Sequence, residues 1–165
     1  MKLCERRSDL FKGIGHETLS LSAREFFDIY FDAVFANHID TARLLASFKN
    51  LTIGNLDVHA LLKRRVADEK LMQLERLLET AEDVPYNDAK VKLEAAVSLM
   101  QSAAKALEDL REYIGKENAL YTTLADKIAT EITRSAVNYY NNTEDDSKIL
   151  STIELFRYAD SIAVT

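Results

Sequence analysis

The side chains that could carry chemistry are few and widely spaced in this chain of 165 residues. None of its histidines, His16, His38 and His59, has a glutamate three residues before it, as di-iron helical bundles require. There is no His-Glu-x-x-His segment, and a single cysteine, Cys4, excludes a paired-cysteine zinc site. We therefore expect no metal and no cofactor. His38 shares a stripe with aromatic residues, and we interpret it as a core residue rather than a ligand.

Motifs for nucleophilic catalysis and for phosphate binding are also missing. The segment 13–15 (Gly-Ile-Gly) lacks the third glycine and the Lys-Ser/Thr pair that complete a phosphate-binding loop. No Gly-x-Ser-x-Gly segment occurs, and Cys4 has no obvious histidine base. We therefore predict that the protein is not an enzyme. The alternative is a small-molecule-binding or enzymatic helical bundle with a site assembled from scattered residues, for which His38, Tyr30 and nearby acids are the candidates.

The charge of the chain disfavours two classes of partner. The formal net charge is −6, and a field of that sign opposes nucleic acids and anionic lipids. One compact basic run, residues 63–65 (Lys-Arg-Arg), is followed after an interval of two residues by Asp68 and Glu69. No segment approaches the roughly 20 apolar residues of a membrane span. The N-terminus has charges where a signal peptide needs apolar residues. We expect a cytoplasmic protein that binds neither nucleic acid nor membrane.

Aromatic residues are the main candidates for binding. Several of them lie within one short helical stretch, and a helix that is apolar on so much of its circumference is either central in the fold or covered by a partner. Core packing and partner binding are both open explanations. A second aromatic pair stands at the end of a later helix, where ring burial with the hydroxyls at the rim is the structural alternative. We predict a protein partner, bound by Phe26, Phe27, Tyr30, Phe35, Tyr139 and Tyr140.

These side chains must be positioned by helices, because the chain has only four glycines and one proline. Apolar residues recur at spacings of three and four from Tyr86 to Ile114, which is typical of a helix that presents one seam to its neighbours. We predict an all-α fold, an antiparallel helical bundle or helical-hairpin array of about five to six helices. The first expected helix starts near Ala23, with a kink near Asn37 and a second helical piece from Asp40 to Phe48. The next expected helices cover about residues 57–82, 86–115 and 117–142, and the last one starts at Thr143 or Asp145.

We expect one all-helical domain over residues 21–165, preceded by a loosely ordered lead-in over residues 1–20. The last helix ends without a glycine, a basic final turn or a polar tail, so we interpret the chain as cut from a longer protein. The face of that helix predicted to point inward consists of Ile149, Ile153, Phe156, Ala159 and Ala163.

One stretch has a family resemblance. Residues 136–141 (Ala-Val-Asn-Tyr-Tyr-Asn), the pair Asp145-Asp146 and residues 155–164 (Leu-Phe-Arg-Tyr-Ala-Asp-Ser-Ile-Ala-Val) resemble a helix hairpin of uncharacterised bacterial helical-repeat proteins. Some of those proteins occur beside J-type chaperone domains. The resemblance covers residues 136–164 and implies a scaffold or co-chaperone role. Together with the absent catalytic motifs, it favours a non-enzymatic helical protein–protein interaction module.

Overall fold

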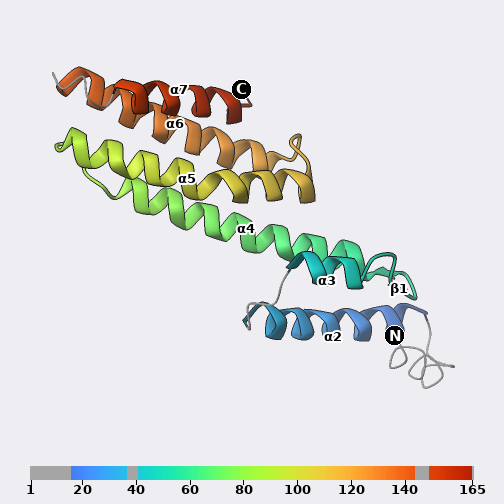
Figure 1. Cartoon of the computed structure of the whole chain (residues 1–165). Helices are drawn as coiled ribbons and strands as arrows, with labels where there is room; N and C mark the ends of the chain where they lie inside the picture. Colours follow the sequence, from blue (N-terminus) through green and yellow to red (C-terminus); the bar gives the residue numbers. More distant parts are fainter. Residues whose placement is uncertain (1–15, 37–40, 144–148, 165) are drawn as a thin grey trace. The chain divides into compact units, whose positions relative to one another are not determined.

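The computed structural model describes residues 16–36, 41–143 and 149–164. Cys4, His38 and the first fifteen residues, which include most of the predicted lead-in, lie outside this part. The described residues are 83% helical, which confirms the predicted all-α helical bundle. The elements are α2 (His16–Ala36), α3 (Thr41–Ser47), β1 (Thr52–Ile53), β2 (Leu56–Asp57), α4 (Val58–Glu82), α5 (Ala89–Ile114), α6 (Ala119–Asn142) and α7 (Ile149–Ile162) (Figure 1).

The chain divides into two compact units, Met1–Val66 and Ala67–Thr165, where the sequence predicted one domain over residues 21–165. The boundary falls within α4, so this helix contributes residues to both units. Helix α2 begins at His16, earlier than the expected start near Ala23. Gly15 is the last helix-breaking residue before it, and nothing between it and the aromatic stretch stops a helix.

The first unit is built on aromatic rings. The centroids of Phe27 and Phe31 lie 5.6 Å apart, and Phe48 lies 5.7 Å from each of them in an edge-to-face arrangement. Strands β1 and β2 pair antiparallel through a two-residue turn, in which Gly54 adopts a φ of 59°. This segment lies between the expected helices that end near residue 48 and begin near residue 57, and the sequence predicted no strand there. The buried apolar residues of the unit are Phe27, Phe31, Val34, Leu44, Val58, Leu62 and Val66.

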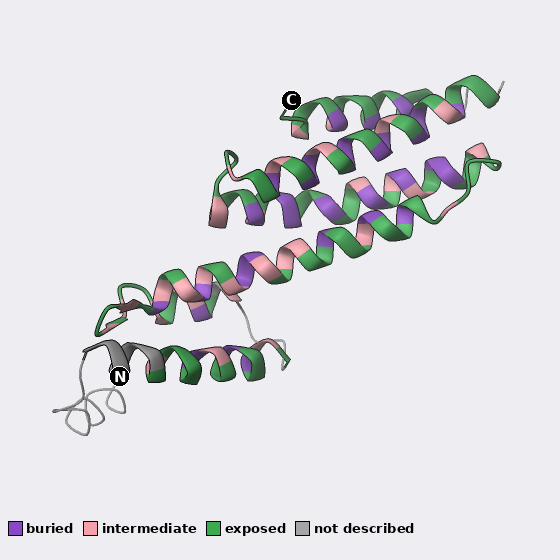
Figure 2. Ribbon diagram, turned by 180° about the vertical axis from the view of Figure 1, so that it is seen from behind, coloured by how far each residue is buried: buried purple, intermediate pink, exposed green. Residues whose placement is uncertain are grey.

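The second unit contains the rest of α4 with α5, α6 and α7, in which consecutive helices run antiparallel (Figure 1). Helix α5 contacts α7 as well as α6, so α7 packs on both of the helices that precede it. Buried positions recur along α5 and α6 (Figure 2). Small side chains there allow the helix axes to approach closely, because they add little bulk between neighbouring backbones. The buried alanines of α5 and α6 are Ala96, Ala103, Ala106, Ala125, Ala129 and Ala136.

Capping residues fix where α5 and α6 begin and end. The Asp88 carboxylate accepts hydrogen bonds of 3.1 Å from the backbone N–H groups of Lys90 and Val91. Helix α5 therefore begins at Ala89, and Tyr86, which the seam pattern included, lies in the preceding loop. Gly115 ends α5 with a φ of 82°, a backbone conformation that residues with a Cβ rarely adopt.

The inward face of α7 differs from the predicted one. Thr152, Leu155 and Ala159 are buried, whereas Ile149, Ile153 and Phe156 stay partly exposed and Ala163 lies beyond the helix and is exposed. The reason is that two apolar stripes run along this helix, and Asp160 interrupts the predicted one. The stripe that contains Leu155, Ala159 and Ile162 carries no charge and packs inward. Within the described residues, every helix is too short or too polar to cross a membrane.

Candidate functional site

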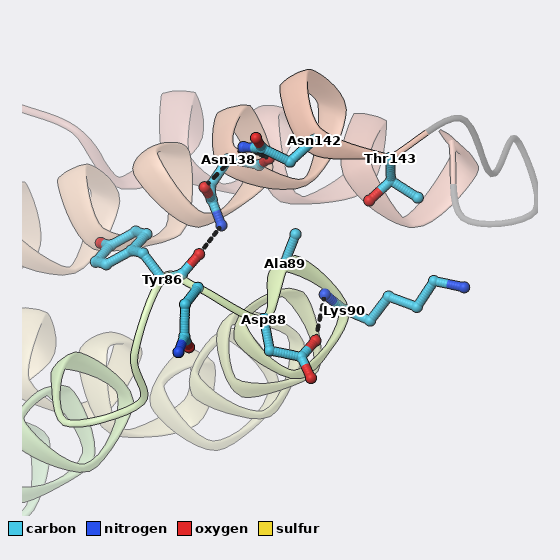
Figure 3. A pocket seen from close by; sticks show the side chains of 8 residues that line it. Tyr86, Asp88, Ala89, Lys90, Asn138, Asn142 and Thr143 are labelled. Carbon is cyan, nitrogen blue, oxygen red and sulfur yellow. Dashed lines mark hydrogen bonds between the residues drawn. The ribbon is translucent and has the colours of Figure 1, made fainter.

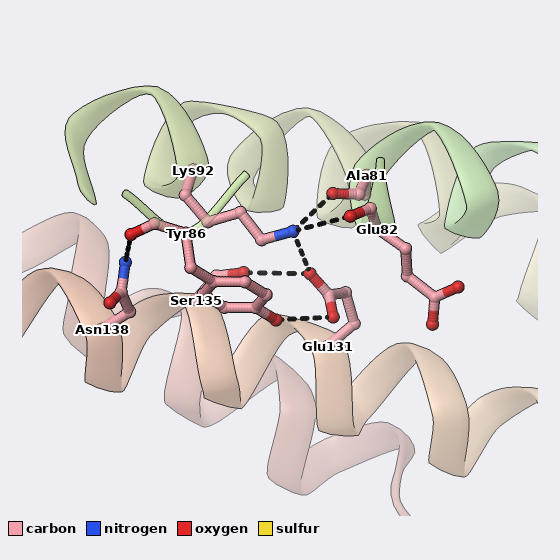
Figure 4. A network of polar contacts seen from close by, with 7 residues as sticks. All are labelled: Ala81, Glu82, Tyr86, Lys92, Glu131, Ser135 and Asn138. Carbon is pink, nitrogen blue, oxygen red and sulfur yellow. Dashed lines mark hydrogen bonds and ion pairs between the residues drawn. The ribbon is translucent and has the colours of Figure 1, made fainter. Parts of the chain in front are cut away.

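A buried ion pair lies at the centre of the second unit. Lys92 of α5 has no exposed side-chain surface, and Glu131 of α6 is 4% exposed. The Lys92 Nζ lies 2.7 Å from Glu131 Oε1 and donates a hydrogen bond of 2.6 Å to the carbonyl of Ala81 (Figure 4). Removing two charges from water is costly, and the pair is tolerated because each charge has several polar partners.

The Lys92 Nζ also donates to the carbonyl of Glu82 at the end of α4, at 3.5 Å, and the other partners of this pair come from the loop before α5 and from α6. The Tyr86 hydroxyl donates to Glu131 Oε2 at 2.9 Å, and the Ser135 hydroxyl donates to Oε1 at 3.3 Å (Figure 4). The Lys92 Nζ also lies 4.2 Å from the centroid of the Tyr86 ring. Burial, and then the hydrogen bond to Glu131, raise the pKa of Tyr86. The network therefore joins the end of α4, the following loop and the start of α5 to α6.

Beside this network, α4 and α6 line a groove of about 770 Å³, which we call the α4–α6 groove. Because α5 is antiparallel to both helices, α4 and α6 run parallel to each other. Leu78 and Leu124 are buried at its floor, and Leu120, which is 60% exposed, stands on its rim. The α4 wall consists of Leu71, Glu75, Leu78, Glu79 and Glu82. The α6 wall consists of Leu120, Thr123, Leu124, Asp126, Lys127, Thr130, Glu131 and Arg134.

The two walls of the groove carry opposite charge on their exposed rims. Glu75, Glu79 and Glu82 follow one another at spacings of four and three, so they share one stripe of α4. Lys127 and Arg134 are seven residues apart and share one stripe of α6. Within the described residues, no ion pair joins these glutamates to Lys127 or Arg134. The charged rims are therefore available to a bound segment.

A second hollow lies at the start of α5 and the end of α6, and its lining is mostly polar (Figure 3). The Asp88 carboxylate in it caps α5, and the Asn138 side chain donates a hydrogen bond of 3.1 Å to the carbonyl of Tyr86 (Figure 3). Asn142 in turn donates to the Asn138 side chain at 3.1 Å. These groups hold the loop against α6, which is a sufficient structural role for them.

The six residues predicted to bind a partner are divided between the two units. In the first unit, Phe26 is 51% exposed and Tyr30 is also exposed, but Phe27 is buried in the aromatic core and Phe35 is half-buried. In the second unit, Tyr139 is buried and Tyr140 is exposed. Phe26, Tyr30 and Tyr140 are thus exposed, while the rings of Phe27 and Tyr139 belong to the core.

The residues of the alternative interpretation are not brought together into one site. His38 lies outside the described residues, and Tyr30 is exposed on α2. Among the residues that the structure describes, no group of three or more histidine, cysteine or acidic side chains is placed to hold a metal ion.

No match was found for this chain among family models, curated proteins or solved structures.

Sequence reasoning missed both the ion pair and the groove. A signal for the ion pair was present, because Lys92 lies four residues before Ala96 of the α5 seam and Glu131 lies three residues after Ile128 on the inward face of α6. Opposite charges on apolar faces of consecutive helices indicate a buried pair. The groove had no such signal, since it depends on the separation of α4 and α6, which are not consecutive.

Proposed function

We propose that this chain is a non-enzymatic protein–protein interaction module and that the α4–α6 groove is its binding surface. The observation that carries the proposal is the combination of a leucine floor with exposed charges on both rims that form no ion pair among the residues described by the structure. Partner-binding surfaces commonly join a desolvated apolar centre to a polar rim, which excludes water and sets the orientation of the partner.

The buried network supports this function by holding the groove in shape. Lys92 contacts the end of the α4 wall through the carbonyl of Ala81, and Glu131 belongs to the α6 wall. The two walls are thereby fixed to each other through α5 before any partner binds. Preorganisation of this kind increases affinity, because less conformational freedom is lost on binding.

The same network could be taken for the scattered catalytic site of the alternative function. Tyr86, Lys92, Glu131 and Ser135 converge, as catalytic groups do. However, the Lys92 ammonium and the Glu131 carboxylate are buried and bonded to each other and to their neighbours. A substrate would have to displace those bonds to reach them, so we favour the structural role.

Two sequence-based expectations belong to the same proposal. The resemblance of residues 136–164 implies a scaffold or co-chaperone role, for which a segment-binding groove is suitable. The single cysteine and the acidic net charge support a cytoplasmic protein with a protein partner.

The test is selection of binders from a displayed library of random peptides on the full chain. Bound peptides are then measured on two variants matched in chemistry, Leu120→Asp on the groove rim and Leu150→Asp on α7, where the leucine is 76% exposed. We expect affinity to fall about tenfold or more for the first variant and to be unchanged for the second. Equal affinities for both variants, with both folded by circular dichroism, would overturn the groove as the binding surface.

A further inference from the structure

We infer that the segment which the α4–α6 groove accepts is an amphipathic helix of about three to four turns with one basic and one acidic flank. This inference rests on the proposed function and adds the chemistry of the partner. The basic flank lies along Glu75, Glu79 and Glu82 of α4, and the acidic flank lies along Lys127 and Arg134 of α6.

The length of the partner follows from the lengths of the walls. The lining residues of α4 extend from Leu71 to Glu82, and those of α6 extend from Leu120 to Arg134. At a rise of about 1.5 Å per residue, these walls are roughly 17 and 21 Å long. A helix that follows the groove along its whole length therefore places roughly 11 to 14 residues in it.

A helix suits this groove better than an extended peptide, because of backbone hydrogen bonding. An extended peptide needs donors and acceptors for its own N–H and C=O groups, as in strand addition to a sheet edge. Both walls here are helices, whose backbone groups are bonded internally, and the floor is leucine. A helix satisfies its own backbone and presents an apolar stripe to such a floor.

The flank charges follow from the groups that remain unpaired in the groove. Of the acidic residues of the α6 wall, Glu131 is paired with Lys92, and Asp126 Oδ1 accepts a hydrogen bond of 2.8 Å from the backbone of Val164. The exposed charges of the α6 rim without such partners are the cations Lys127 and Arg134. The charged residues of the α4 wall are all glutamates. The potential therefore changes sign across the groove, and a helix with segregated flank charges complements it.

The groove selects a helix whose basic and acidic residues are on separate flanks. It does not select which of the two flanks is the basic one. A helix turned end to end over the same apolar stripe exchanges its two flanks. A peptide with the flanks exchanged would therefore bind in the opposite direction along the groove. A peptide with both signs on each flank has no favourable direction, because some like charges face each other either way.

The probes are two synthetic helical peptides of about 14 residues with the same leucine stripe and the same composition. The segregated peptide carries lysines on one flank and glutamates on the other. The control peptide carries alternating lysines and glutamates on each flank. By fluorescence anisotropy at low salt, we expect the segregated peptide to bind about tenfold more tightly. At about 0.5 M salt this preference should shrink, because exposed charges are screened.

Charge reversal on the protein provides a rescue test. The double variant E75K/E79K should weaken binding of the segregated peptide about tenfold, since the α4 rim then carries two lysines against the one remaining glutamate, Glu82, and both rims are net basic. Adding K127E/R134E exchanges the signs of the two rims and should restore binding, with the peptide reversed in direction. The control is E112K/E154K, which makes the same charge change at exposed positions outside the groove and should leave the peptide preference intact.

The outcomes separate this inference from the proposed function. If both peptides, or the peptides selected from the library, bind in a Leu120-dependent way without any preference for segregated charge, the inference is wrong and the groove still binds protein. If no peptide binds in a Leu120-dependent way, the proposed function fails and this inference fails with it. Restored affinity in the fourfold variant supports the inference. If the substitutions acted only by disturbing the structure or the apolar contacts, four of them would weaken binding more than two.

Discussion

The two units of this chain bury their apolar surface in opposite ways. The first unit relies on a few large rings, in which Phe48 packs edge to face against Phe27 and Phe31. The second unit relies on alanines such as Ala103 and Ala125, which bring α5 and α6 close together, and on a buried ion pair. A ring core is sensitive to loss of volume, whereas a close helix contact is sensitive to added volume.

The exposed surfaces of the units differ as well. Helix α2 exposes Phe26, Ile29 and Tyr30 on one stripe, and the exposed charged side chains beside Ile29, those of Glu25 and Asp32, are both acidic. The α4–α6 groove exposes less apolar surface but has oppositely charged rims. Apolar surface supplies affinity for many partners, and the charges around it supply the selection. The four predictions below test this contrast between the units, from the largest effect on stability to the smallest.

The largest effect should come from breaking the buried ion pair. Lys92→Met leaves the Glu131 carboxylate buried without its cation, and we expect the free energy of unfolding of the second unit to fall by about 3–5 kcal/mol. Denaturant melts monitored by hydrogen exchange in α5 and α6 measure it. The double variant Lys92→Met/Glu131→Leu should recover most of the loss, because no uncompensated charge is then buried. A double variant as unstable as the single one would contradict this explanation.

Removing one ring from the first unit should have a comparable effect. Phe31 has no exposed surface, and Phe31→Ala should lower the free energy of unfolding of that unit by about 3–5 kcal/mol, through lost transfer energy and a cavity. The measurement is loss of amide protection in α2 and α3. Phe26→Ala, which truncates an exposed ring of the same helix, is the matched control and should cost less than about 1 kcal/mol.

Adding volume should harm the second unit to an intermediate degree. Ala103 is fully buried in α5, so Ala103→Leu should destabilise by about 1–3 kcal/mol through overpacking. The neighbouring Ala104 is exposed, and Ala104→Leu should leave the denaturation midpoint nearly unchanged. Equal midpoints for the two variants would mean that the seam of α5 does not face another helix closely.

The smallest effect concerns Tyr158 of α7, whose buried hydroxyl has no hydrogen-bond partner among the described residues. Tyr158→Phe removes an unsatisfied polar group, so at neutral pH its effect should lie within about 0.5 kcal/mol or be stabilising.

The pH dependence of the same variant gives a sharper test. Burial raises the pKa of Tyr158 to about 12, above the unfolded value near 10. A raised folded pKa means that the neutral form is favoured in the folded state. The stability that neutral Tyr158 contributes to the folded state is therefore present below about pH 10 and is lost as the pH rises toward about 12. Tyr158→Phe should therefore lose less stability than the wild type over this interval, and parallel curves would contradict the assignment.

The elements that sequence periodicity predicted well are those whose signals are local. The predicted helix 57–82 matches α4, because Pro85 ends it and an uninterrupted apolar pattern fills it. The seam of α5 was confirmed at Leu93, Ala96 and Leu107, which are buried. A three-four spacing identifies the face of a helix whenever a single apolar stripe is present.

The errors arose where two local patterns competed or where contacts were distant. Helix α7 has two apolar stripes, and only contact with α6 decides that Leu155 packs inward and Phe156 does not. Phe26 and Phe27 are adjacent in sequence, yet one is exposed and the other buried, because adjacent helical residues point in different directions. The groove joins helices separated by all of α5, so no single stretch of sequence describes it.

The burial of Lys92 has a practical consequence for solution studies. Amine-reactive reagents need an unprotonated, accessible amino group, and Lys92 offers none while its ammonium is ion-paired and covered. Exposed lysines such as Lys127 would be labelled in the folded protein. Mass spectrometry of pulse-labelled protein would then record Lys92 only in molecules whose second unit has opened. The chain thus contains its own reporter for that opening, with the exposed lysines as an internal standard.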